Sequence, residues 1–305
     1  MDWLYRISIT CFAASYLVAF ALEVSRIFFR RTFQKYLIAG ITGAGFFAHT
    51  VYLALQTQLD LGPNGVWLGS WAGWCLSAAW VLIAAYLWIS IRKPRAVVGL
   101  FLLPMVMLII GVATRLQILG PFSTSQAKSL WSMIHGMALL LGTVTVALGF
   151  IFGIMYLIQA FRLKKKMVPS ELFRLPSLEW LQRCSEVALM VSASLLGVGL
   201  ISGIVINFIK NQSDPSGTRV PWDDPVVWTS GVLFAWLLAA TLFSRLYQPA
   251  RHGRKVAYLV VASFLFLVLE LGIVWITGHA FQGDESNLTL GIVEWLEAFL
   301  QESRS

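Results

Sequence analysis

Eight apolar stretches, each near the roughly 20 residues needed to cross a bilayer, dominate this sequence and leave little room for any other fold. They lie at about 7–28, 36–56, 66–91, 96–116, 130–160, 187–209, 226–246 and 256–278. Only 12% of the 305 residues are charged and 58% are hydrophobic, whereas a soluble domain carries about a quarter charged residues. The sequence therefore predicts an all-α, polytopic membrane bundle as a single unit over residues 1–280, followed by an outer amphipathic tail at 281–305.

The basic residues predict how this bundle is oriented. Lys and Arg concentrate in every second loop: at Arg30, Arg31 and Lys35, at Arg92, Lys93 and Arg95, at Arg162 and Lys164 to Lys166, and at Arg245, Arg251, Arg254 and Lys255. By the positive-inside rule these loops face the cytoplasm, which places both termini outside. The formal net charge of +8 is explained by this pattern, so we expect membrane lipid and no nucleic acid as a partner. A prokaryotic cytoplasmic membrane is the expected location.

Local signals mark several helix starts. Pro176-Ser-Leu-Glu179 offers Ser177 as a helix cap, and we expect residues 169–183 to form an amphipathic, partly interfacial helix before the sixth span. Pro225 suits the first turn of the seventh span. The three cysteines are widely spaced and form no metal-binding pattern, which indicates core residues.

Three of the four histidines map to the predicted outer half of the bundle. His49 lies in the second span, His135 near the start of the fifth and His279 after the eighth, whereas His252 lies in a basic cytoplasmic loop. A lone histidine in a membrane is more often a hydrogen-bonding group between helices than a ligand. Three at one depth favour a functional site, because ionisable groups in a membrane are costly. Neutral imidazole is a regular axial ligand of haem iron.

An aromatic and acidic loop, Arg219-Val-Pro-Trp-Asp-Asp-Pro-Val-Val-Trp228, lies between the histidine-bearing spans. A flat, iron-centred ligand would need such a platform, with Trp222 and Trp228 available for stacking. Arg115 ends the fourth span, where it either snorkels to the interface or holds a ligand carboxylate. No hydrolase, nucleotide-binding or metalloprotease motif occurs in a usable context, so we expect no independent catalysis.

These residues resemble the CcsA/CcmC/HemX-type cytochrome c assembly proteins, which are haem-handling membrane proteins. Trp222-Asp-Asp-Pro-Val-Val-Trp228 matches the end of that family's tryptophan-rich outer loop, and His135 and His279 fall at its two external haem ligands. The upstream tryptophans are replaced by Gly217 to Pro221, and Val226 occupies the position of the family's glutamate. The resemblance covers roughly residues 36–280.

The resemblance implies a b-type haem, bound transiently during cytochrome c maturation. His135 and His279 would be its axial ligands, Trp222 and Trp228 the stacking platform, and Asp223 would order the loop. Arg219 or Arg115 would meet a propionate, and His49 would be a transient or alternative ligand. The implied partners are apocytochrome c and other maturation components. Three alternatives stay open: a HemX-like accessory role in tetrapyrrole synthesis, a transporter of another solute, and a membrane anchor without haem.

Overall fold

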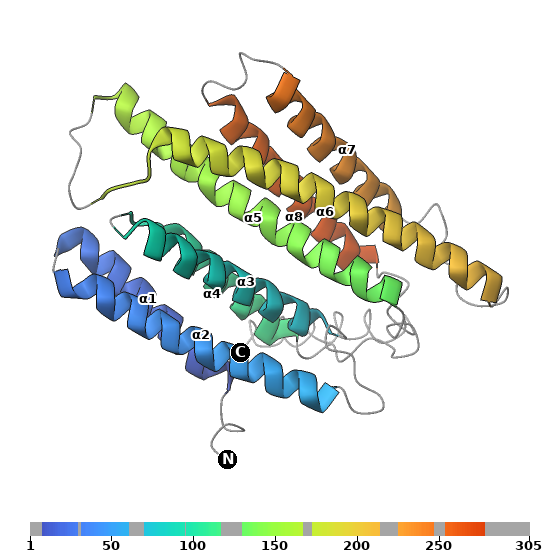
Figure 1. The fold of residues 1–305 in the computed structure, drawn as a ribbon, viewed down its shortest axis with the longest axis horizontal. Coiled ribbons are helices and arrows are strands. Elements are labelled where there is room, and N and C mark those ends of the chain that lie inside the picture. Colours follow the sequence, from blue (N-terminus) through green and yellow to red (C-terminus); the bar gives the residue numbers. More distant parts are fainter. Residues whose placement is uncertain are drawn as a thin grey trace, which may run out of the picture.

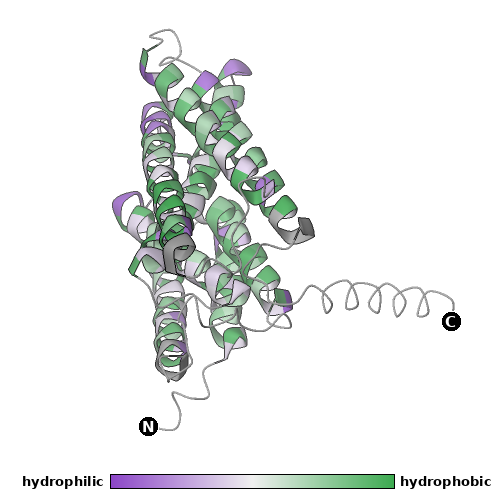
Figure 2. Ribbon diagram, turned by 90° about the vertical axis from the view of Figure 1, so that its right-hand side faces the viewer, coloured by the Kyte–Doolittle hydropathy of each residue, from purple (hydrophilic) through white to green (hydrophobic). Residues whose placement is uncertain are grey.

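The computed structural model describes residues 8–29, 32–60, 70–94, 96–116, 130–166, 173–213, 225–246 and 254–277. This part of the chain forms eight helices, without a β-strand. They are α1 (Ile9–Phe28), α2 (Thr32–Asp60), α3 (Trp71–Arg92), α4 (Gly99–Leu116), α5 (Leu130–Lys164), α6 (Leu178–Ser213), α7 (Pro225–Leu246) and α8 (Lys255–Thr277). All eight are long and apolar enough to cross a membrane, which confirms the predicted fold class. Figure 2 shows hydrophobic residues along most of each helix and hydrophilic residues mainly toward the helix ends.

The helices form two rings of four that lie side by side (Figure 1). In the first ring each of α1, α2, α3 and α4 packs against two of the others. Helices α5 to α8 form the second ring, in which α6 and α8 also touch each other. Contacts between α3 and α5 join the rings. We call the end at which the odd-numbered helices begin the outer end, after the side that the charge pattern predicts, and the opposite end the inner end.

Two helix starts match the local signals in the sequence. The Ser177 hydroxyl accepts a 3.4 Å hydrogen bond from the Trp180 amide and so caps α6, as predicted. Helix α7 begins at Pro225, also as predicted. We expected a separate amphipathic helix over residues 169–183. This prediction is wrong for residues 178–183, because they form the first turns of the continuous helix α6. Residues 167–172 and the tail from 278 onward lie outside the described residues.

Small residues set the close approach of α5 to its neighbours. A Cβ added at Gly149 would lie 3.1 Å from the Ala188 Cβ of α6, and one at Gly153 would lie 2.5 Å from a Val260 methyl of α8. Glycine lets two helix backbones approach where a larger side chain would hold them apart. This packing puts α5 in contact with both α6 and α8 of the second ring.

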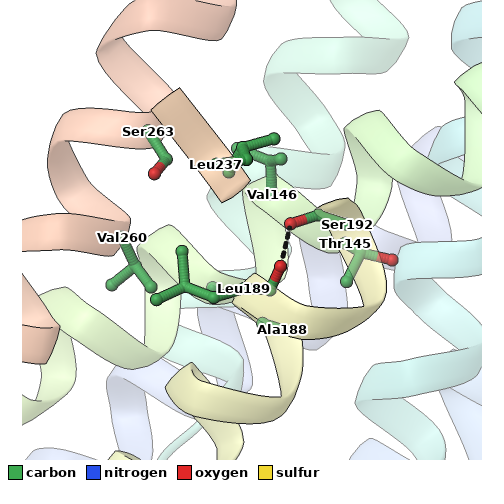
Figure 3. A pocket seen from close by; sticks show the side chains of 9 residues that line it. Thr145, Val146, Ala188, Leu189, Ser192, Leu237, Val260 and Ser263 are labelled. Carbon is green, nitrogen blue, oxygen red and sulfur yellow. Dashed lines mark hydrogen bonds between the residues drawn. The ribbon is translucent and has the colours of Figure 1, made fainter. Parts of the chain in front are cut away.

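The centre of the second ring is filled by side chains. Figure 3 shows Val146, Leu189, Leu237 and Val260 meeting from all four helices, with the Ser192 hydroxyl bonded to the Leu189 carbonyl of its own helix. These four side chains are at most 3% exposed. The void between them has no room for a water molecule. A ligand of any size must therefore approach this ring from an end or from its outer surface.

Candidate functional site

His135 lies about a turn and a half inside the outer end of α5, and its ring is fixed by the neighbouring helix α6. The Nδ1 atom is 2.7 Å from the Gly199 carbonyl oxygen. A carbonyl can only accept a hydrogen bond, so Nδ1 carries the proton and donates it. The neutral imidazole therefore keeps its lone pair on Nε2.

The segment Gly199-Leu-Ile-Ser-Gly203 of α6 provides the surface on which this ring rests. A Cβ added at Gly203 would lie 3.0 Å from Cε1 and 3.2 Å from Nδ1 of His135, so glycine leaves room for the imidazole. The Ser202 hydroxyl lies 3.4 Å from Nδ1 and donates a 2.8 Å hydrogen bond to the same Gly199 carbonyl. The two glycines thus form a small-residue motif that places a histidine against a carbonyl.

The Nε2 atom of His135 makes no hydrogen bond within the described part of the chain. The side chain as a whole is half-buried. A ring nitrogen with a free lone pair, whose opposite N–H donates to a carbonyl, is the usual arrangement of a metal-ligating histidine. The described residues contain no cluster of three or more metal-binding side chains.

A second polar pair lies toward the outer end of the same ring. The Ser230 hydroxyl of α7 donates a short hydrogen bond to Oε1 of Glu270 on α8. Ser230 is about a turn and a half from the start of α7, and Glu270 about two turns from the end of α8. Their depth along the bundle is therefore comparable to that of His135.

His49 occupies a different environment inside the first ring. Its imidazole stacks on the Phe12 ring, with centroids 4.1 Å apart, and its Nδ1 shares a 3.2 Å hydrogen bond with the Tyr16 hydroxyl. The side chain is fully buried, and Nε2 is enclosed without a hydrogen-bond partner. His49 and His135 thus belong to separate rings, and a ligand could reach the buried His49 ring only if the helices around it moved apart.

The structure describes two further predicted site residues, and it does not bring them into contact with His135. Trp228 lies in the first turn of α7, with 66% of its side chain exposed. Arg115 is exposed in the last turn of α4, in the first ring. Arg219, Trp222, Asp223 and His279 lie outside the described residues, as does His252.

Sequence reasoning did not assign Gly199, Ser202 and Gly203 to the site. The signal that could have identified them is the spacing of the two glycines by four positions on an apolar helix, which is typical of close helix packing. The pairing of Ser230 with Glu270 was also missed. It joins two helices, and no spacing along the chain indicates such a pair.

The described helices are those of a polytopic membrane protein, and the imidazole of His135 is held in a fixed orientation near the outer end of the second ring. Residues 70–279 match the model of the cytochrome c assembly protein family, and the chain belongs to this family. The match begins at the residue that caps α3 and ends at His279, so α1 and α2 lie outside it. Membership supports a role in cytochrome c maturation, in concert with other maturation components. No curated protein matches the chain in a sequence search.

Proposed function

We propose that this protein binds haem at its outer end and delivers it during cytochrome c maturation, with His135 and His279 as the two axial ligands. Haem is the cargo of this process. The observation that carries the proposal is the 2.7 Å contact between His135 Nδ1 and the Gly199 carbonyl oxygen, because a donated Nδ1–H leaves Nε2 available to iron. The hydrogen bond to Gly199 also makes Nε2 a better electron donor than a free imidazole would be.

Other residues would hold the edges and faces of the cargo. Trp222 and Trp228 would stack on the porphyrin, and the exposed Trp228 ring is available for this without rearrangement of α7. Arg219 or Arg115 would pair with a propionate, since a guanidinium forms a two-pronged bond with a carboxylate. Asp223 would order the loop. His49 would take part only after its ring leaves Phe12, which makes it an alternative ligand and not a permanent one.

Absorption spectroscopy of the purified protein after addition of haem tests this proposal. The wild type should show a Soret band with the features of bis-histidine coordination. His135→Ala and His279→Ala should each weaken it, and added imidazole should restore it in His135→Gly. His252→Ala is the matched control and should leave the band unchanged. An absent band in the wild type, or a band indifferent to both outer histidines, would refute haem binding at this site.

An accessory role in haem handling is the second candidate, and the loss of tryptophans from the outer loop favours it. Gly217 to Pro221 replace the tryptophans expected upstream of Trp222, which leaves a smaller stacking surface. A deletion strain distinguishes the roles. Loss of covalent cytochrome c with normal haem levels supports delivery, whereas altered tetrapyrrole levels with normal cytochrome c support the accessory role.

A further inference from the structure

The inner end of the second ring carries a groove that the haem site does not use. It has a volume of about 330 Å³ and lies between α5 and α8. Its walls are Leu157, Ile158, Phe161, Arg254 and Tyr258. Four of these five side chains are apolar or aromatic, and the fifth is a cation.

The two walls present the same order of chemistry from the inner end toward the middle of the membrane. Along α5 toward its inner end, Phe161 follows Leu157 after about one helical turn, and Lys165 comes one residue after the end of the helix. On α8, Tyr258 follows Arg254 at the same interval. Cations therefore lie at the mouth, aromatic rings one turn deeper and aliphatic side chains deeper still.

Two cations lie at this end of the groove: Arg254 lines it, and Lys165 contacts the Phe161 ring, which also lines it. The Arg254 guanidinium donates a 3.3 Å hydrogen bond from Nη2 to the Ala160 carbonyl of α5, and a guanidinium has four further N–H donors. The Lys165 ammonium lies 4.6 Å from the centroid of the Phe161 ring. Residues 157–166 and 254–262, which form the two walls, contain no Asp or Glu. The two wall segments therefore carry basic side chains and no acidic ones.

We propose that this groove is a binding site for one anionic phospholipid of the inner leaflet. Its phosphate lies between Arg254 and Lys165, its glycerol region lies against Phe161 and Tyr258, and its acyl chains run past Leu157 and Ile158 into the bilayer. Basic pockets between membrane helices bind anionic headgroups in this way. The half-exposed rings of Phe161 and Tyr258, at 51% and 57%, would be covered by the lipid. A free phosphate would leave them uncovered, and this favours a lipid over an inorganic anion.

Native mass spectrometry of the full chain, with added phosphatidylglycerol or phosphatidylcholine of identical acyl chains, tests the site. Two cations at the mouth predict that one phosphatidylglycerol binds roughly tenfold more tightly than phosphatidylcholine. The double variant Arg254→Gln, Lys165→Gln should abolish this preference. Ile158→Trp, which fills the groove and keeps both charges, should reduce binding of both lipids at the site.

The matched control is Arg92→Gln. Arg92 is also a cation at the inner end and lies 4.5 Å from the Trp88 ring centroid, but it lies on α3, away from the groove. It should keep the wild-type preference. Equal binding of the two lipids by the wild type, or an unchanged preference in the folded double variant, would overturn the proposal. Displacement of phosphatidylglycerol by an equal concentration of inorganic phosphate would also overturn it, because the site would then recognise an anion alone.

Discussion

The Tyr86 hydroxyl donates a 3.0 Å hydrogen bond to Oε1 of Glu23, and this bond joins α3 to α1 toward the inner end of the first ring. The second oxygen of this buried carboxylate lies 3.5 Å from Nη1 of Arg26, whose Nη2 donates a 2.7 Å hydrogen bond to the Pro94 carbonyl. Gly99 leaves room for the carboxylate, since a Cβ there would lie 2.9 Å from Glu23. A chain of polar contacts thus ties α1 to the connection between α3 and α4.

Tyr86→Phe should destabilise the protein by about 1–3 kcal/mol, because it removes the donor and leaves Oε1 of Glu23 buried without it. Reversible unfolding in a denaturing detergent measures the change. Tyr36→Phe is the control, since Tyr36 is 65% exposed and should tolerate the same loss of a hydroxyl. Equal free energies of unfolding for both variants would show that the bond contributes nothing.

Gly203→Ala should weaken haem binding roughly tenfold. The new methyl group would push the His135 ring away from the Gly199 carbonyl. Loss of such a hydrogen-bond partner lowers the affinity of a histidine for a metal. Haem titration followed by absorption measures this. Gly231→Ala in α7 is the matched control, since a Cβ there meets no atom within 4 Å. The prediction fails if the two variants bind haem alike.

Gly153→Ala should cost about 1–3 kcal/mol of stability, because its Cβ would press on Val260 and on the Ala257 carbonyl of α8. Gly111→Ala in α4 should instead increase the free energy of unfolding by about 0.5–1 kcal/mol, because alanine favours the helix and its methyl group meets no other atom there. Thermal unfolding of both variants gives the comparison. A stabilised Gly153→Ala would mean that α5 and α8 approach less closely than described.

Single cysteines should report the orientation of the bundle. With Cys11, Cys75 and Cys184 replaced by serine, Leu130→Cys should react with a membrane-impermeant maleimide in intact cells. Lys164→Cys at the other end of α5 should react only after lysis, because the basic loops are predicted to lie inside. The reverse labelling pattern would invert the predicted topology.

Most helix limits could be predicted because apolar runs and turn residues are local signals. The fifth span was expected from residue 130 and the last to 278, and the helices are Leu130–Lys164 and Lys255–Thr277. Helix α6 differs most from its expected limits, since it was expected from residue 187 and begins at Leu178. Its charged start does not resemble a membrane span. Arg183 pairs with Glu179 at 2.6 Å, one turn away, so the helix continues through polar sequence.

The candidate site was predictable in part. The sequence placed His135 at its depth, but the rotation of its ring depends on two glycines of another helix. His49 shows the same limit more strongly. Its depth followed from the span limits, whereas its enclosure by Phe12 and Tyr16 depends on how α1 packs against α2. Contacts between helices have no fixed sequence spacing, so single-chain patterns do not reveal them.

The length of α6 has a consequence for how a partner could meet this protein. Its 36 residues span about 54 Å, against a hydrocarbon layer of about 30 Å. Even at a tilt of 40°, near the steepest seen, such a rod covers about 41 Å of depth, so its tips stand in the headgroup region or in water. A partner protein could therefore contact a stiff helical surface outside the lipid. This surface belongs to the same helix as Gly199, whose carbonyl orients His135.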